Sequence, residues 1–488
     1  MVYPQKRLAL LSSLVLAAVM TRTDGVAGDL EAGLAYHEFK LTLAPGERRE
    51  GLGPMYYFEE RESVHVWAVP PVFSYTLDRE TDFSEFDLAY PFLTYDRFGS
   101  EYRFQILQLL NFAGGKTQTD ANVRRFTLFP LYFQQRSPVA GKNYTALFPI
   151  YGRLQNRLFR DEIRFAMFPI YGQSRKKGII TDNYLYPIFH LRRGDGLRGW
   201  QLWPVVGSEH KDVTASTNEW GEAQKLGGHD KFFLLWPIFF NQTTGVGTEN
   251  PERQQALLPL YSFLRSPQRD STTCPWPLGL TITDDRARKY REVGAPWPLV
   301  VFARGEGKYG NRIWPLFGHV RNPILQSDFY LWPLYKYNRA HAAPLDRERT
   351  RILFFLYSDL SEKNEETGTA LERTDLWPLF TAKRDHDGNQ RLQVLALLEP
   401  FLPNNKSIER NYSPIWSIWR SESNGKSGAS SQSFLWNLYR LDTTAKTRKC
   451  SLLFGLFQYQ SDPEGKRLRI LYIPFGKGKK PKPVQRES

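Results

Sequence analysis

One five-residue pattern recurs along most of this chain and constrains its fold more than any other feature. Its first residue is apolar, its second is aromatic or leucine, and its third is proline. The fourth is leucine, isoleucine or valine and the fifth varies, as in LWPLF at 376–380. We call each copy a box. Degenerate copies that depart from this form occur at 353–357, 398–402, 415–419, 435–439 and 453–457. The repeat prolines are Pro130, Pro149, Pro169, Pro187, Pro204, Pro237, Pro259, Pro277, Pro298, Pro315, Pro333 and Pro378.

The boxes are spaced at a nearly constant interval. Successive centres lie 17 to 23 residues apart, except for one step of 33 that contains an insertion at 208–230. A fixed period of this size is the signature of a repeat architecture, in which each repeat packs on its neighbours. The spacing predicts one repeat domain over residues 65–475, preceded by lead-in strands at 29–64.

Each repeat has the chemistry of a strand followed by a turn. The boxes are rich in aromatic and branched residues, which favour strands. Between boxes lie turn signals such as Asp195-Gly196 and Pro463-Glu464-Gly465, where glycine supplies a positive φ without steric cost. Tight hairpins join antiparallel neighbours. The chain is therefore predicted to be all-β, an antiparallel up-and-down meander of roughly 18 to 21 strands of about 10–12 residues each.

An open sheet of this length would leave the backbone N–H and C=O groups of its edge strands unpaired. Closing it into one large β-barrel removes the exposed edges, and the same signature on every strand favours that solution. A propeller of four-stranded blades, a β-solenoid with coils of this length and a soluble open β-repeat sheet are the alternatives. The hairpin turns argue against the solenoid.

The prolines are unexpected in a strand. Proline cannot donate to the hydrogen-bond ladder and is normally confined to edges and bulges. If every box lies in the middle of a strand, the prolines line up at one height of the sheet. We therefore expect a bend at this height in each strand, which would form a waist around the barrel.

The N-terminus predicts export. Lys6 and Arg7 precede an apolar run at 8–20, and small residues follow at 26–28, the pattern of a signal peptide over residues 1–28. Strands of the expected length could cross an outer membrane when tilted. Two observations favour a soluble protein instead: tryptophan lies at the centre of the boxes rather than at strand ends, and connection lengths do not alternate between short and long. We expect an outer-membrane or periplasmic location.

Charge and motifs limit the chemistry. The net charge is +14, with a basic tail at 476–488, so lipid, lipopolysaccharide and glycans are the expected partners and nucleic acid is not. No catalytic motif, cofactor motif or metal-ligand spacing is present, and no enzymatic activity is expected. Cys274 and Cys450 could form one bridge or remain two free, buried thiols.

Three further stretches accompany the boxes, at 43–60 (LAPGERREGLGPMYYFEE), 410–420 (RNYSPIWSIWR) and 451–460 (SLLFGLFQYQ). With them, the chain resembles a group of uncharacterised exported bacterial proteins built from LWPLY-type tandem repeats. The resemblance implies a Gram-negative cell envelope and carries no activity. The predicted function is an outer-membrane-type β-barrel with a structural or transport role. The alternative is a soluble periplasmic or surface protein that binds glycans through exposed aromatic side chains.

Overall fold

The chain folds as an all-β antiparallel meander, as the sequence predicts. This computed structural model describes residues 33–116, 122–217, 223–463 and 465–475. Within them, 43 strands form one sheet and two further strands form a separate hairpin. The predicted signal peptide at 1–28 and the basic tail at 476–488 lie outside the described residues.

The first part of the sheet runs from the lead-in strands to the insertion, and the separate hairpin follows. Its strands are β1 (His37–Lys40), β2 (Glu47–Gly51), β3 (Tyr56–Arg61), β4 (Val64–Val69), β5 (Phe73–Asp78), β6 (Phe83–Leu88), β7 (Leu93–Phe98), β8 (Glu101–Ile106), β9 (Leu110–Gly115), β10 (Val123–Leu128), β11 (Tyr132–Arg136), β12 (Tyr144–Leu147), β13 (Tyr151–Arg157), β14 (Arg160–Ala166), β15 (Tyr171–Lys176), β16 (Ile179–Tyr184), β17 (Phe189–Gly194), β18 (Leu197–Leu202), β19 (Val206–Lys211), and in the hairpin β20 (Thr214–Thr217) and β21 (Ala223–Leu226).

The second part of the sheet continues from β19 to the last described residues. Its strands are β22 (Gly228–Leu234), β23 (Phe239–Val246), β24 (Glu252–Leu257), β25 (Tyr261–Arg265), β26 (Arg269–Cys274), β27 (Leu280–Asp285), β28 (Tyr290–Gly294), β29 (Val300–Gly305), β30 (Tyr309–Ile313), β31 (Phe317–Arg321), β32 (Leu325–Tyr330), β33 (Tyr335–Ala342), β34 (Leu345–Ile352), β35 (Tyr357–Asn364), β36 (Ala370–Leu376), β37 (Phe380–Arg384), β38 (Gln390–Val394), β39 (Trp419–Ser423), β40 (Ser430–Phe434), β41 (Tyr439–Thr443), β42 (Arg448–Leu452), β43 (Phe457–Asp462), β44 (Gly465–Ile470) and β45 (Ile473–Phe475).

In the part of the chain that the structure describes, helices are few and short. Two α-helices, α2 (Lys406–Asn411) and α3 (Ser413–Trp416), lie between β38 and β39. Three single-turn 3₁₀ helices occur at Gly33–Ala35, Gly53–Met55 and Ala140–Lys142. The Asn405 side chain caps α2 by accepting a hydrogen bond from the backbone N–H of Ile408, which satisfies one of the free donors at the start of the helix.

The predicted number and length of the strands are wrong. The described strands are 3 to 8 residues long, and there are more than twice as many of them as expected. The boxes lie in turns and not inside strands, so each repeat of about 20 residues contributes two strands and two turns. The signature therefore marks every second turn and not every strand.

The turn at 167–170 shows how a box reverses the chain. Its Phe168–Pro169 peptide bond is cis, and the backbone N–H of Ile170 donates to the carbonyl oxygen of Met167 at 2.8 Å. This is a type VI turn, which requires a cis proline at its third position. Proline has no backbone N–H, and at this position of the turn no N–H is needed to pair with a neighbouring strand.

The turns at the other ends of the strands follow the predicted glycine chemistry. Asp195 and Gly196 connect β17 to β18 with φ values of 50° and 70°, and Lys177 and Gly178 connect β15 to β16 with 48° and 76°. Two consecutive positive φ values define a two-residue I′ turn, whose twist matches that of the strands it joins. The Asp-Gly hairpin signal in the sequence is confirmed.

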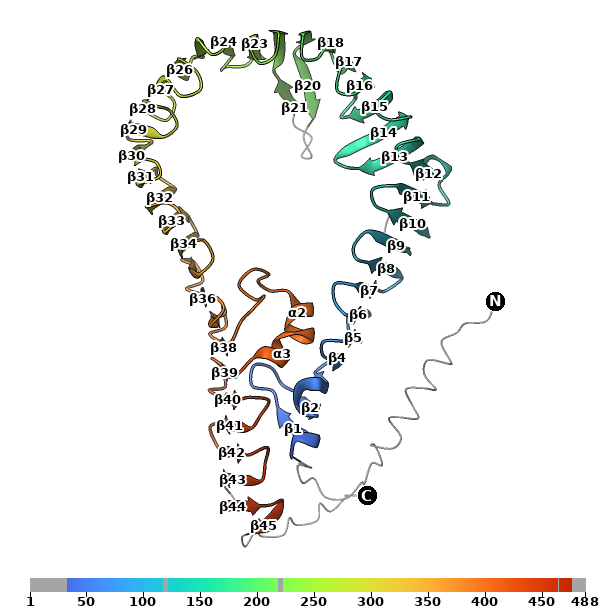
Figure 1. Ribbon diagram of the computed structural model, residues 1–488, viewed down its shortest axis with the longest axis vertical. Helices are drawn as coiled ribbons and strands as arrows, with labels where there is room; N and C mark the ends of the chain where they lie inside the picture. The colour runs from blue at the N-terminus through green and yellow to red at the C-terminus, as the bar shows by residue number, and fades with distance from the viewer. Residues whose placement is uncertain (1–32, 117–121, 218–222, 464, 476–488) are drawn as a thin grey trace.

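The sheet is a narrow ribbon of a single layer along most of its length (Figure 1). A six-residue strand is about 20 Å long, which sets the width of the ribbon. Some of the buried apolar side chains form two small clusters, and the others are scattered along the chain. One cluster consists of Tyr57, Val66 and Ala68, and the other of Phe133, Tyr144, Ala146, Leu154 and Phe165.

The ribbon bends into a wide loop whose two ends meet (Figure 1). Strands β1–β5 lie beside α2, α3 and the C-terminal strands at the narrow end, and the β20–β21 hairpin points into the loop. Within the described residues, β1 pairs only with β2 and β45 only with β44. Among the described residues, the N-terminal strands are therefore joined to the region from α2 to β41 by contacts of side chains.

Candidate functional site

All the repeat prolines lie in turns at one edge of the ribbon. Consecutive turns of an antiparallel meander alternate between its two edges, and each repeat contains two turns, so every box reaches the same edge. Trp377, Pro378 and Leu379, for example, form the turn between β36 and β37. The expectation of mid-strand prolines that bend the sheet into a waist is therefore wrong.

We call this edge the apolar edge. It consists of the turns at 70–72, 89–92, 107–109, 129–131, 148–150, 167–170, 185–188, 203–205, 235–238, 258–260, 275–279, 295–299, 314–316, 331–334, 353–356, 377–379, 435–438, 453–456 and 471–472.

The boxes expose apolar side chains at this edge in a regular way. The residue after the proline is exposed in every proline-containing box but the one at 296–300, where Leu299 is half-buried. The aromatic residue before the proline is also exposed in most of them. The exposed aromatic residues are Phe129, Tyr186, Trp203, Trp236, Trp276, Trp314, Trp332 and Trp377.

Neighbouring boxes touch along the edge. The rings of Trp314 and Trp332 lie 6.0 Å apart between centroids, and those of Phe168 and Tyr186 lie 5.5 Å apart. The backbone connects the turns as well, since the N–H of Trp332 donates to the carbonyl oxygen of Pro315 at 2.7 Å. The apolar side chains therefore form a row along the edge, with ring pairs at favourable separations.

The opposite edge has a different character, and we call it the polar edge. Its turns carry exposed ion pairs such as Lys289–Glu306 at 3.0 Å and Lys426–Asp387 at 2.8 Å. Ile324 and the pair Leu158 and Phe159 are exposed apolar side chains at this edge. The ribbon is thus amphipathic across its width, although its two faces are of mixed composition.

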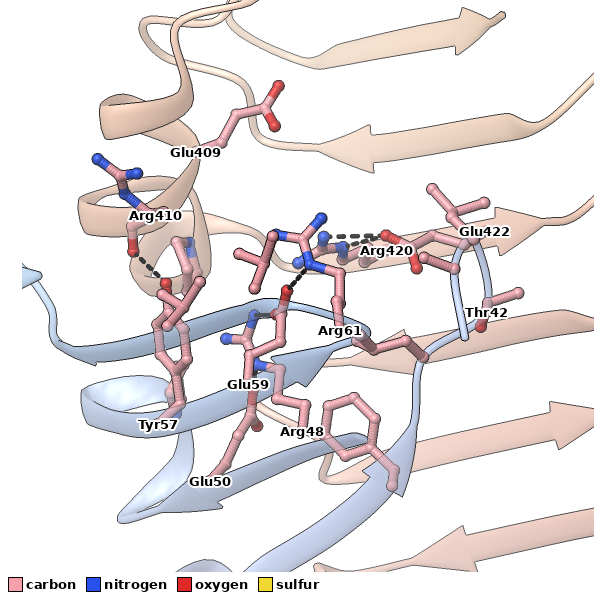
Figure 2. Close-up of a pocket in the computed structure, with 18 of the residues that line it drawn as sticks. Thr42, Arg48, Glu50, Tyr57, Glu59, Arg61, Glu409, Arg410, Arg420 and Glu422 are labelled. Carbon is pink, nitrogen blue, oxygen red and sulfur yellow. Dashed lines mark hydrogen bonds and ion pairs between the residues drawn. The ribbon is translucent and has the colours of Figure 1, made fainter. Parts of the chain in front are cut away.

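The contact that joins the two parts of the ribbon surrounds a cavity of about 560 Å³. Strands β2 and β3 line one side of it, and α2, β39 and β41 line the other (Figure 2). We call this region the closing contact.

Arg410 of α2 is at the centre of the closing contact. Its guanidinium group donates to Glu85 at 2.7 Å and to Asp87 at 3.0 Å, and its carbonyl oxygen accepts a hydrogen bond from the Tyr57 hydroxyl at 3.1 Å. Several further contacts span the same joint. Among them are Thr42 to Ser431 at 2.6 Å, Asn437 to Glu50 at 2.6 Å, and the Arg440 guanidinium over the Phe39 ring at 3.5 Å.

Most of the carboxylates that line this cavity, Glu50, Glu59, Glu85, Glu409 and Glu422, are paired with arginines. Burial alone would raise the pKa of Glu422, but the guanidinium groups of Arg420 and Arg391 outweigh it and lower that pKa to about 2. Burial raises the pKa of the Tyr57 hydroxyl to about 12. A general base needs a pKa near the working pH, and these two groups are far from it. The arrangement is that of an internal joint, in which pairing stabilises buried charges.

One group of side chains has the composition of a metal site. His341 Nδ1 lies 3.8 Å from Asp346 Oδ1 and 3.8 Å from Glu365 Oε1 at the polar edge. Arg339 already donates to Asp346 at 2.6 Å and 3.0 Å, so its guanidinium occupies the position that a cation would need. The sequence predicts no metal, and we propose none here.

The two cysteines are free in the structure. Cys274 is exposed and Cys450 is half-buried. The expectation that free thiols would be buried is therefore wrong for Cys274, which ends β26 next to the box at 275–279.

Sequence reasoning missed the closing contact. Arg410 and Glu85 are separated by 325 residues, and neither belongs to a box. The available signal was the pair of degenerate boxes at 398–402 and 415–419, which flank or overlap α2 and α3 in the structure.

No family model matches the chain, and no curated protein matches it. The described part of the chain holds no helix long and apolar enough to cross a membrane.

Proposed function

We propose that this protein is a non-enzymatic component of a Gram-negative cell envelope that lies on a lipid membrane with its apolar edge in the interfacial region. The observation that carries the proposal is the row of exposed aromatic and aliphatic side chains, which recurs in register at every second turn. Soluble monomers rarely expose contiguous apolar patches of such extent.

The length of the strands argues for lying on the membrane and against spanning it. A tilted strand needs about 9–11 residues to cross a bilayer, and the described strands have 3 to 8. Turns of three to five residues with exposed tryptophan match the depth of the headgroup region, where amphipathic rings are favoured. In this proposal the ribbon forms a ring closed by side chains instead of the predicted hydrogen-bonded barrel.

Charge adds to the attraction. The net charge is +14, and a basic protein is drawn to anionic headgroups and to lipopolysaccharide. Export through the N-terminal signal peptide would place the protein in the periplasm, where both membranes are accessible. The role we propose is structural, a ring that shapes or organises the membrane surface on which it lies.

A second candidate is glycan binding from solution. It is favoured by tryptophans that remain exposed beside one another, as Trp314 and Trp332 do, because exposed aromatic rings can stack on the apolar faces of sugars. The membrane proposal explains more of the edge, since the leucine and isoleucine after each proline offer nothing to a sugar hydroxyl.

Vesicle flotation tests the proposal. The purified mature chain is mixed with vesicles of zwitterionic lipid, with and without anionic lipid, and floated in a density gradient. We expect flotation with both compositions and tighter binding with the anionic lipid, because apolar insertion persists when charge attraction is removed. A protein that stays at the bottom with both vesicle types, or that floats only with anionic lipid at low salt, contradicts insertion of the apolar edge.

A further inference from the structure

One stretch of the ribbon carries apolar side chains from the apolar edge across its face to the polar edge. It covers β11–β16 and contains a groove of about 310 Å³. Phe129, Phe148 and Phe168 line it at the apolar edge, and Leu158 lines it at the tip of the β13–β14 hairpin. We call it the cross-sheet groove.

The register of the strands explains the floor of the groove. Phe165 of β14 lies opposite Gly152 of β13 and Gly172 of β15, so a large side chain stands between two positions without any. Phe165 packs with Leu154 and Phe133 in the larger buried cluster, and the ring of Phe148 meets it edge-on at 5.7 Å. The buried side chains form the bottom, and the space above Gly172 remains open.

The far end of the groove is unusual for the polar edge. Leu158 and Phe159 form the β13–β14 turn with φ values of 52° and 57°, a conformation that bulky side chains rarely adopt. Phe159 is 94% exposed. Apolar surface therefore extends to both edges of the ribbon at this place.

Three of the polar residues that line the groove already have partners for their side chains. Arg164 pairs with Glu162 at 2.7 Å, Gln173 donates to Asp182 at 2.6 Å, and Asn183 donates to the carbonyl oxygen of Gly172 at 3.0 Å. A polar ligand would gain little from these groups, because each hydrogen bond it made would replace an existing one.

The backbone excludes a peptide in an added strand. Such a ligand needs an open strand edge for its own N–H and C=O groups, and β11 to β16 are each paired on both sides. An occupant of this groove must bring apolar surface and no demand for hydrogen bonds. A hydrocarbon chain meets both conditions, and the volume lies in the range of about 300–1,000 Å³ typical of small-molecule sites.

We propose that the cross-sheet groove binds one acyl chain of a membrane lipid. This inference rests on the proposed function, because the groove opens on the apolar edge and would take its lipid from the leaflet in which that edge lies. The chain would leave the leaflet beside Phe148 and Phe168 and run along the face of β13–β15 toward Leu158.

The test uses the full mature chain, delipidated, and dansyl-labelled undecanoic acid as the probe. Gly172→Leu fills the groove, since a Cβ at this position meets no atom closer than 3.8 Å and the backbone has no positive φ. Gly141→Leu is the matched control, because nothing lies within 4 Å of its added Cβ and it does not line the groove. Ser174→Leu, on the same wall, is a second filling variant. Circular dichroism melts check that each variant folds.

We expect saturable binding of one probe per chain. Filling the groove removes contact with two or more methylene groups and should weaken binding about tenfold, whereas Gly141→Leu should bind as the unchanged chain does. Absence of probe binding to the unchanged chain, or equal binding by folded filling variants, overturns the inference.

Flotation of the same variants separates this inference from the proposed function. Gly172→Leu should still float with vesicles, because the apolar edge is intact. Loss of probe binding only in the filling variants, together with no flotation of any chain, would support the acyl-chain site and overturn the membrane proposal. Flotation of every chain with no probe binding would support the membrane proposal and overturn the acyl-chain site.

Discussion

A triple substitution at the apolar edge tests the physical reason for the proposed membrane contact. Leu316, Leu334 and Leu379 each follow a repeat proline and are 53%, 44% and 57% exposed. We predict that Leu316→Glu, Leu334→Glu and Leu379→Glu together abolish most vesicle binding while the protein remains folded.

The magnitude follows from the exposed surface. Burying a whole leucine side chain is worth about 1.5–3 kcal/mol, and roughly half of each of these side chains is left to bury. Each leucine should therefore contribute about 1 kcal/mol, and the three together about 3 kcal/mol, which is roughly a hundredfold in the partition constant. The glutamates add a cost of their own, because a carboxylate resists transfer from water.

A matched control lies at the opposite edge. Val139, Ile324 and Leu345 are 50%, 55% and 46% exposed and flank turns of the polar edge. Their triple substitution to glutamate changes the net charge by the same three units, so any loss of long-range attraction is equal in both variants. Ile324 and Leu316 flank opposite ends of β31, which places the two changes at either side of one strand.

Flotation against increasing lipid concentration measures the partition constant of each protein, and urea unfolding measures its stability. We expect the control to bind within about threefold of the unchanged chain and both variants to lose little stability, since exposed turn substitutions usually cost within about 0.5 kcal/mol. Equal weakening by the two triple variants would attribute binding to charge alone. No weakening by the apolar-edge variant would refute the reasoning.

Three further predictions concern the closing contact and the groove. Arg410→Leu should destabilise the closing contact by about 3–5 kcal/mol, because it leaves buried carboxylates without their arginine partner. Small-angle scattering should then show a larger radius of gyration, whereas Lys289→Ala, at an exposed ion pair, should leave the radius unchanged. Equal radii for the two variants would contradict a joint held by Arg410. The pKa of Glu422 is lowered to about 2, so its ionised form should stabilise the fold by on the order of 3 kcal/mol. This contribution should be complete above about pH 5 and should be lost as the pH falls toward 2. Glu422→Gln should flatten this part of a profile of melting temperature against pH, and an unaltered profile would argue against the pairing. Gly152→Ala should lower the free energy of unfolding by about 1–3 kcal/mol, since the added Cβ would lie 2.3 Å from the Cβ of Ala146. In a urea titration, Gly172→Ala should be tolerated. Equal losses of stability in the two variants would contradict the packing described for the groove.

Local signals predicted the local structure well. Asp195 and Gly196 form an I′ turn, in which both central residues need a positive φ. Asp-Gly tolerates this conformation, so the local sequence is enough to specify the turn. The period of about 20 residues predicted a repeating antiparallel meander for the same reason, as each hairpin contacts mainly the next. The boxes were placed in strands because aromatic and branched residues favour strands; the structure places them in turns, where a cis proline after an aromatic residue closes a type VI turn.

The sequence by itself determined that this chain is a repeating antiparallel β-meander with glycine turns between the boxes, since these properties depend on residues a few positions apart. Only the tertiary structure decided that all the boxes gather at one edge, because that outcome depends on whether a repeat holds one strand or two. It also decided how the loop closes. Arg410 meets Glu85 and Asp87 only after every intervening hairpin has added its bend and twist, and no local pattern encodes where the two ends of so long a ribbon arrive.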